Sequence, residues 1–247
     1  MKIPFKNYKS YYEEYFIDDK KRPLIVIIPG GGYAHTSIRE SLPIKDIYNK
    51  NGYHCIVIHY TEDHLYYPFP SKMCAEVIKK YENDPRVSHL IGIGFSAGGH
   101  NLLEIALHKE NYAVNFDLIM LSYPVITTDN KYWHKGSFEY LLGDKIDDQA
   151  MLKRLSMENE VKKDAPDLFL WGTFTDESVD VMNSIKLVEA YKKNGLSVEY
   201  HLYPMGGHGL SLATEESSGG DNKKVIPYVS TWINESLKWL EYKLKEL

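Results

Sequence analysis

The chain has 247 residues, 43% of them hydrophobic, and a formal net charge of −5, which fits one globular domain of moderate size. With 29 basic against 34 acidic residues, it lacks the basic excess that follows nucleic-acid phosphates or anionic lipids, so we expect no nucleic-acid partner. The two cysteines, Cys55 and Cys74, form neither a CxxC motif nor a Cys/His metal spacing. We expect both to be buried packing residues in a reducing compartment.

The N-terminal stretch MKIPFKNYKSYYEEYF lacks the apolar core and cleavage site of a secretion signal. No stretch approaches the roughly 18 apolar residues of a membrane-spanning helix. These features predict a cytoplasmic protein with no membrane partner. A homodimer is left open by the sequence.

Strand-like and helix-like segments alternate along the chain. The segments 89–95 and 117–125 have the continuous apolar character of parallel strands covered on both faces. The helical segments carry apolar residues three or four positions apart, and two of them end at an Asn-Gly pair. The expected strands are 23–33, 53–60, 89–95, 117–125, 168–174 and 198–204, and the expected helices lie within 44–52, 73–81, 185–195 and 229–244.

This alternation predicts an α/β fold with a mostly parallel central sheet and helices on both faces. We expect a single domain over residues 1–247 and no large separate cap domain. The longest irregular segment, residues 126–166, lies between two strands and is polar and mixed. Segments of this length are often lids or substrate loops, so this one is a candidate lid.

The sequence GFSAGG places Ser96 between a buried strand and a helix-like run. So tight a turn forces the serine into a strained backbone conformation, and its small neighbours let strand and helix approach each other. The hydroxyl then lies at the amino end of the helix, where free amides favour developing negative charge. Ser96 is therefore a candidate nucleophile, although a GxSxG pattern alone also fits a glycine-rich connector.

A serine hydroxyl needs a base to take its proton and an acid to orient that base. Asp176 lies just past one expected strand, and His208 lies in a glycine-flanked loop after the next. The order serine, acid, histidine differs from the orders in chymotrypsin and subtilisin and is typical of one other fold. We predict that Asp176 orients His208 and that His208 activates Ser96.

Other residues compete for these roles less well. Glu177 and Asp180 fall later in the turn and at the start of the next helix, where acids often serve the helix dipole. His201 lies within a strand, and His100 occupies a helix position where packing or capping is the commoner role. The remaining histidines weighed, which precede the serine and have no ligand spacing, are His54, His59 and His64.

Acyl transfer also requires amides aimed at the oxygen that becomes negative. One donor is expected from Ala97, directly after the serine. The other is expected from Gly31 or Gly32 in the PGGGY sequence, where the chain leaves its first long strand without obstructing side chains. A triple glycine alone also fits a flexible turn, but its pairing with GFSAGG favours an oxyanion hole.

Together these motifs resemble the α/β-hydrolase fold and, within it, the small bacterial esterases related to acetyl xylan esterases. The resemblance implies a catalytic triad of Ser96, Asp176 and His208. It also implies amide donors at Gly31, Gly32 and Ala97. The motifs that carry it span nearly the whole chain: IPGGGYAHTSIRE, YPFP, GIGFSAGGH, LSYPVIT, GSFEYLLGD, WGTFTDESVDVMNS and YPMGGHGL.

The chain departs from the family pattern in two places. Pro29 stands where relatives carry a histidine before the glycines, and VDV follows the acid where relatives often carry VPV. Neither departure removes a group that the chemistry needs. The resemblance therefore implies a serine esterase that needs no metal or cofactor and acts on short acyl esters, with acetylated sugars or xylo-oligosaccharides as the leading substrates.

Tyr33 and Trp133 are candidate walls of the substrate pocket, and ordinary packing is an equal alternative for both. Two other functions stay open. A peptidase of the prolyl oligopeptidase type shares the order of the three residues, although such enzymes usually carry a large additional domain. A non-catalytic binding protein on a hydrolase scaffold is the other, although such proteins commonly lose a triad member.

Overall fold

A mostly parallel sheet organises the molecule. The computed structural model describes residues 2–247, and within them the sheet has eight strands in the order β1-β2-β4-β3-β5-β6-β7-β8. Strands β3 to β8 run parallel to one another. At one edge, β2 is antiparallel to β4 and β1 is antiparallel to β2. The strands are β1 (Lys2–Pro4), β2 (Tyr11–Tyr15), β3 (Arg22–Ile28), β4 (His54–His59), β5 (Val87–Phe95), β6 (Leu118–Ser122), β7 (Asp167–Thr173) and β8 (Val198–Tyr203).

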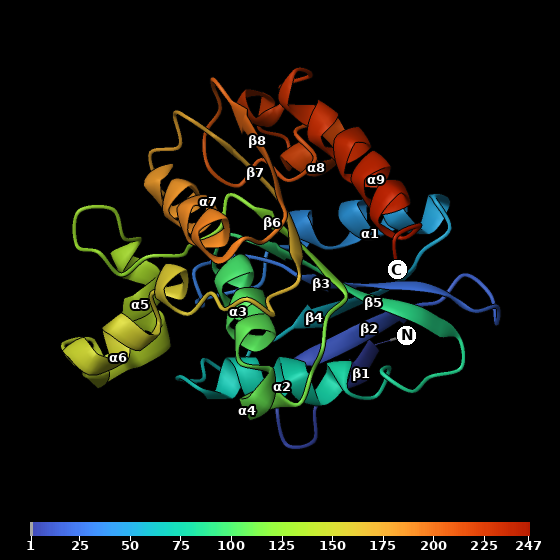
Figure 1. Cartoon of the computed structure of the whole chain (residues 1–247), viewed down its shortest axis with the longest axis horizontal. Coiled ribbons are helices and arrows are strands. Elements are labelled where there is room, and N and C mark those ends of the chain that lie inside the picture. The colour runs from blue at the N-terminus through green and yellow to red at the C-terminus, as the bar shows by residue number, and fades with distance from the viewer. Residues whose placement is uncertain (1) are drawn as a thin grey trace.

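Helices cover both faces of this sheet (Figure 1). The α/β architecture expected from the sequence is thereby confirmed, and no separate cap is evident within residues 2–247. The helices are α1 (Leu42–Lys50), α2 (Phe69–Ile78), α3 (Ala97–Leu107), α4 (Lys109–Tyr112), α5 (Lys135–Leu142), α6 (Gln149–Arg154), α7 (Met182–Asn194), α8 (Glu215–Ser218) and α9 (Trp232–Lys243).

The apolar core lies in two layers because successive side chains of a strand point to opposite faces. In β3, Val26 and Ile28 belong to the cluster that packs against α2, α3 and α7. Ile25 and Ile27 of the same strand belong to the cluster that packs against α1 and α9. The central strands are thus buried on both sides, as their continuous apolar runs predict.

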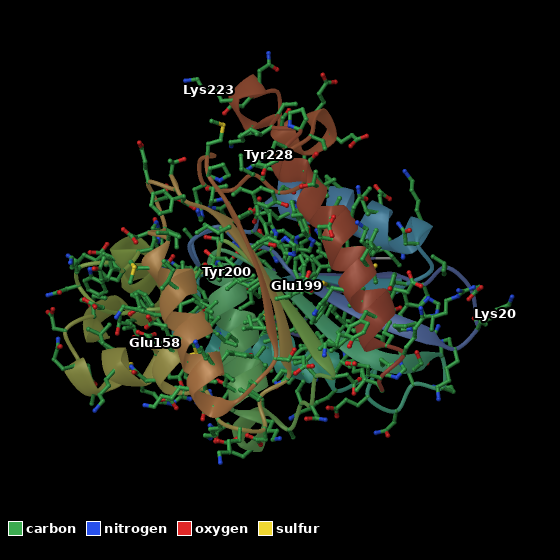
Figure 2. All side chains as sticks on the ribbon, turned by 45° about the horizontal axis from the view of Figure 1, so that its top comes forward. Lys20, Glu158, Glu199, Tyr200, Lys223 and Tyr228 are labelled. Carbon is green, nitrogen blue, oxygen red and sulfur yellow. The ribbon has the colours of Figure 1, made fainter. Side chains whose placement is uncertain are left out.

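Both cysteines are buried and unpaired, which confirms the expected packing role. Apart from Glu40, Glu104 and Asp176, the aspartate, glutamate, lysine and arginine side chains among the described residues are exposed or half-buried, and Figure 2 shows Lys20 and Lys223 pointing away from the body of the molecule. No helix among the described residues is long and apolar enough to cross a membrane.

The fold differs from the sequence prediction in two segments. Strands β1 and β2 were not predicted, because β2 is the polar run YYEEY, whose residues are mostly half-buried at the edge of the sheet. The segment 126–166 is not irregular, since it contains α5 and α6. In α5 the apolar residues Phe138, Leu141 and Leu142 are buried on one face, which is a short amphipathic pattern. In α6 the carboxylate of Asp148 caps the first turn.

A buried carboxylate attaches this segment to the rest of the molecule. Glu104 of α3 is 1% exposed, and Arg154 at the end of α6 donates to both of its oxygens at 2.9 and 3.0 Å. The hydroxyl of Tyr112 donates to the same carboxylate at 2.9 Å, and Nδ1 of His108 lies 3.2 Å from it. Burial alone raises the pKa of Glu104, but the hydrogen bonds from His108 and Arg154 outweigh it and lower that pKa to about 2.

Gly94 marks the closest approach of α3 to β5, and replacing it by alanine is expected to destabilise the fold. A methyl group there would lie 2.6 Å from Cα of Gly99 and 2.7 Å from the carbonyl oxygen of Gly98, so backbone would have to move. We expect a loss of about 1 to 3 kcal/mol in the free energy of unfolding, measured by thermal denaturation. Gly207→Ala, whose methyl group meets no atom within 4 Å, is the matched control. Equal midpoints for the two variants would contradict the expectation.

Removing the charge of Glu104 should change how stability depends on pH. The folded-state pKa of about 2 lies below the ordinary 4.5, so the stabilisation is present above pH 4.5 and is lost as the pH falls toward 2. We expect Glu104→Gln to lower the free energy of unfolding by about 1.5 to 3 kcal/mol at neutral pH. The difference between variant and wild type should shrink below pH 4.5, as measured by urea unfolding across pH. A difference that is constant with pH would rule out this account.

Candidate active site

Ser96 lies at the sharp turn between β5 and α3. Its φ of 51° is in the left-handed region that only a well-supported non-glycine residue adopts. Its amide donates to the carbonyl of Ser122 at 3.0 Å, and its own carbonyl accepts the amides of Gly99 and Val125 at 3.0 and 3.1 Å. Added bulk at Gly98 would meet the carbonyl oxygens of Ile28 and Pro29 at 2.2 and 2.3 Å. The strained turn expected from GFSAGG is therefore present.

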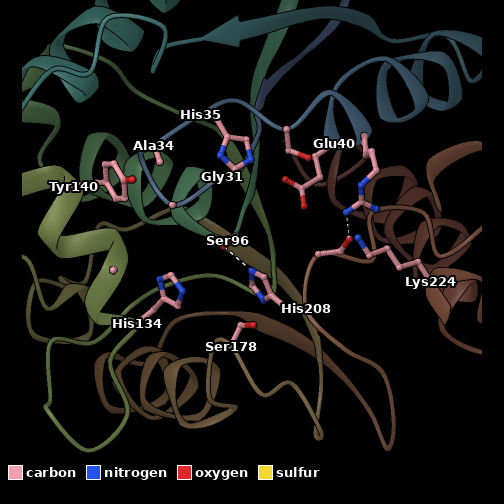
Figure 3. Close-up of a pocket in the computed structure, with 15 residues that line it drawn as sticks. Gly31, Ala34, His35, Glu40, Ser96, His134, Tyr140, Ser178, His208 and Lys224 are labelled. Carbon is pink, nitrogen blue, oxygen red and sulfur yellow. Dashed lines mark hydrogen bonds between the residues drawn. The ribbon is translucent and has the colours of Figure 1, made fainter. Parts of the chain in front are cut away.

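The structure brings the three distant residues Ser96, His208 and Asp176 into one hydrogen-bonded chain. Oγ of Ser96 lies 2.8 Å from Nε2 of His208, and Nδ1 of His208 lies 2.7 Å from Oδ2 of Asp176. Figure 3 shows the first of these contacts at the centre of the pocket. With Nδ1–H donating to the carboxylate, Nε2 is free to accept the serine proton. This geometry allows the hydroxyl to act as an activated nucleophile.

Asp176 is itself held in place by the backbone. Its Oδ1 accepts the amides of Ser178 and Val179, both at 2.9 Å, and its side chain is 2% exposed. The neighbouring acids lie elsewhere: Glu177 is exposed, and Asp180 is exposed and accepts the amide of Met182 at 2.8 Å near the start of α7. Of the three acids, only Asp176 contacts the imidazole.

The glycine loop after β3 borders the same pocket. Gly31 and Gly32 line it and have φ values of 125° and 65°, which favour glycine. Ala97 is buried and begins α3 directly after Ser96. Among residues 2–247, the amides of Gly31, Gly32 and Ala97 have no protein acceptor. They are available to bind an oxygen that gains negative charge.

Glu40, which the sequence analysis did not identify, connects this loop to the imidazole. It is 3% exposed, and its Oε2 accepts the amide of Gly30 at 2.8 Å. The hydroxyl of Tyr123 donates to Oε1 at 2.7 Å and accepts the amide of Ser211 at 2.9 Å. Burial and then the charge of Glu40 raise the pKa of Tyr123 well above its ordinary value, so the hydroxyl remains a donor.

The ring of Tyr123 also contacts the imidazole of His208 edge to face, with ring centres 5.1 Å apart. Arg39, next to Glu40 in the sequence, donates to the carbonyls of Ser217 at 2.9 Å and Gly209 at 2.5 Å. The short helical turn Ile38–Glu40 therefore fixes the loop that carries the imidazole. Contacts between segments so far apart in sequence leave no local signal, which is why residue patterns did not reveal them.

Tyr33 and Trp133 do not border the pocket, which corrects the expectation that they form its walls. Tyr33 is 3% exposed and its hydroxyl donates to Nδ1 of His100 at 2.8 Å. Nε2 of His100 in turn lies 2.8 Å from the carbonyl of Leu155. Trp133 stacks on Phe138 with ring centres 6.2 Å apart. Both rings pack, because the loop turns Tyr33 inward and α5 covers Trp133.

The pocket at the end of the sheet has a volume of about 460 Å³. The helical segment after β6 contributes His134 and Tyr140 to it, and the C-terminal loops contribute Gly209 and Lys224. None of these was singled out from the sequence as a pocket residue. Within residues 2–247 no cluster of His, Cys, Asp or Glu could hold a metal ion.

Comparison with known proteins places this chain in a family. Residues 72–238 match the family model described as the prolyl oligopeptidase family, Peptidase_S9. A curated relative, the endo-1,4-beta-xylanase B of Butyrivibrio fibrisolvens, is 32% identical over 82% of this chain and 35% of its own length. The acetylxylan esterase of Xylanibacter ruminicola is 30% identical over 77% of this chain and 41% of its own length. The chain thus spans between a third and about two fifths of these relatives.

A solved structure matches over a larger share of both chains. The acetyl ester-xyloside bifunctional hydrolase of Caldicellulosiruptor lactoaceticus is 32% identical, with a TM-score of 0.83, over 96% of this chain and 89% of that one. On this match and on the family model, the chain belongs to the prolyl oligopeptidase family of α/β hydrolases.

Proposed function

We propose that the protein is a serine esterase that hydrolyses short-chain acyl esters, with acetyl esters of sugars or xylo-oligosaccharides as the substrate class. The observation that carries this proposal is the hydrogen-bonded chain of Ser96, His208 and Asp176 at a pocket bordered by Gly31 and Gly32. The names of the similar proteins, an acetylxylan esterase and an acetyl ester-xyloside hydrolase, support the substrate class.

In the proposed reaction, Oγ of Ser96 attacks the ester carbonyl carbon while Nε2 of His208 takes the hydroxyl proton. The carbonyl oxygen becomes negative and is bound by the amide of Ala97 and by one from Gly31 or Gly32. His208 then gives its proton to the leaving alcohol oxygen, which leaves an acyl group on Ser96. A water molecule, deprotonated by the same imidazole, releases the acid and restores the hydroxyl.

Peptide hydrolysis is a second candidate, favoured by the match to the prolyl oligopeptidase family. The same three side chains and amides serve acyl transfer from an ester or from an amide. What separates the two functions is the group that occupies the pocket, so substrate comparison decides between them.

Replacement of Ser96 by alanine is expected to abolish turnover of p-nitrophenyl acetate, because it removes the hydroxyl that is hydrogen-bonded to Nε2 of His208. Loss of the nucleophile costs on the order of a million-fold in a well-studied serine protease. Release of p-nitrophenol measures the rate, and a fluorophosphonate probe should label the wild type but not the variant. A variant that keeps the wild-type rate, at an unchanged melting temperature, would refute the assigned role.

A substrate panel should place the enzyme among esterases. We expect hydrolysis of acetyl esters that depends on Ser96 and no release of p-nitroaniline from prolyl peptide anilides above the level of Ser96→Ala. Both assays use equal concentrations of enzyme and measure the absorbance of the released nitroaromatic product. Cleavage of the anilides that is lost in Ser96→Ala would favour the peptidase instead.

A further inference from the structure

The helix α5 presents a histidine to the pocket in a fixed tautomer. His134 caps this helix, and its Nδ1 accepts the amide of Ser137 at 3.2 Å and lies 2.8 Å from the Ser137 hydroxyl. A nitrogen that accepts from a backbone amide carries no hydrogen, so the neutral ring keeps its proton on Nε2. The cap therefore makes Nε2–H a hydrogen-bond donor.

That donor has no acceptor among residues 2–247, although His134 borders the pocket. Burial, followed by the positive charge that His208 can carry, lowers the pKa of His134, which keeps the ring neutral. A half-buried N–H without a protein partner is satisfied by an oxygen of water or of a bound molecule.

Tyr140 lies on the same helix and lines the same pocket with 45% of its surface exposed. Its ring is 5.3 Å from the ring of His64, which is 5.4 Å from that of Tyr66. Gly143, directly after α5, packs closely against Tyr66, because a methyl group at Gly143 would meet the Tyr66 ring at 2.6 Å. This aromatic cluster offers an apolar face beside the donor.

His134 and Tyr140 line the same pocket as Ser96 and His208. His208 has to deliver its proton to the leaving oxygen, so the alcohol lies next to this imidazole. The charge on His208 affects the pKa of His134, and Figure 3 shows both imidazoles and the Tyr140 ring around the pocket that contains Ser96. A group bound there meets one hydrogen-bond donor and one aromatic face.

We propose that His134 and Tyr140 bind the sugar ring that forms the alcohol part of the ester. Nε2–H of His134 donates to a sugar hydroxyl next to the ester, and Tyr140 covers an apolar face of the ring. A sugar ring carries both features, hydroxyl oxygens at its edge and C–H groups on its faces. The inference rests on the proposed esterase function and names the residues that select its substrate.

The test uses two acetyl esters with different alcohols, a mono-O-acetylated methyl xyloside and p-nitrophenyl acetate. The latter has no hydroxyl next to its ester, so the ratio of kcat/KM for the two substrates isolates recognition of the sugar. His134→Asn keeps an acceptor for the helix cap but has no donor at the position of Nε2. His134→Gln places an amide N–H near that position. Tyr140→Phe keeps the aromatic face that Tyr140→Ala removes.

We expect His134→Asn to lower the sugar-to-aryl ratio about 5- to 10-fold through loss of one hydrogen bond, with the change in KM for the sugar ester. His134→Gln should retain most of the ratio even if its weakened cap lowers the melting temperature. Tyr140→Ala should lower the ratio about 3- to 10-fold, and Tyr140→Phe should not.

Two results overturn the inference. If wild type cleaves both esters and the ratio is equal in His134→Asn and His134→Gln, the donor role is wrong while the esterase function stands. If neither ester is cleaved in a manner that depends on Ser96, the proposed function fails and the inference fails with it.

Discussion

The candidate active site depends on the backbone of Ser96, whose positive φ turns the chain from strand into helix within one residue. That conformation is unfavourable for a residue with a side chain, and it persists because its surroundings leave no alternative. Gly94 and Gly98 let α3 touch β5 and the end of β3 directly, at distances where a methyl group would collide with backbone. The same turn exposes the hydroxyl to the pocket and leaves the amide of Ala97 unpaired.

Glu40 supplies the second constraint, since one buried carboxylate joins the glycine loop, through Gly30, to the loop of His208, through Tyr123. The amides expected to bind the oxyanion and the imidazole expected to move the proton belong to segments separated by well over a hundred residues. Because both are held to one anchor, their spacing is set by side-chain hydrogen bonds as well as by the sheet. Preorganised donors of this kind need no rearrangement as charge develops.

The α/β fold and the meeting of Ser96, Asp176 and His208 were predictable because each residue follows an expected strand, and carboxyl ends of parallel strands share one edge of the sheet. The contacts of Glu40 and Tyr123 were not, since they join residues far apart in the sequence, such as 40 and 123. Tyr33 was expected at the pocket wall because it follows the glycines, but its position in the sequence does not tell which way the chain turns there. The helices α5 and α6 were missed because they are only 8 and 6 residues long.

The pair of Glu104 and Arg154 holds the end of α6 against α3. The candidate catalytic residues follow strands of the sheet, whereas His134 and Tyr140 belong to the helical segment between β6 and β7. Under the proposed function, reaction type and substrate choice are carried by separable parts of the chain. Exchange of the helical segment would then change the preferred alcohol without disturbing proton transfer.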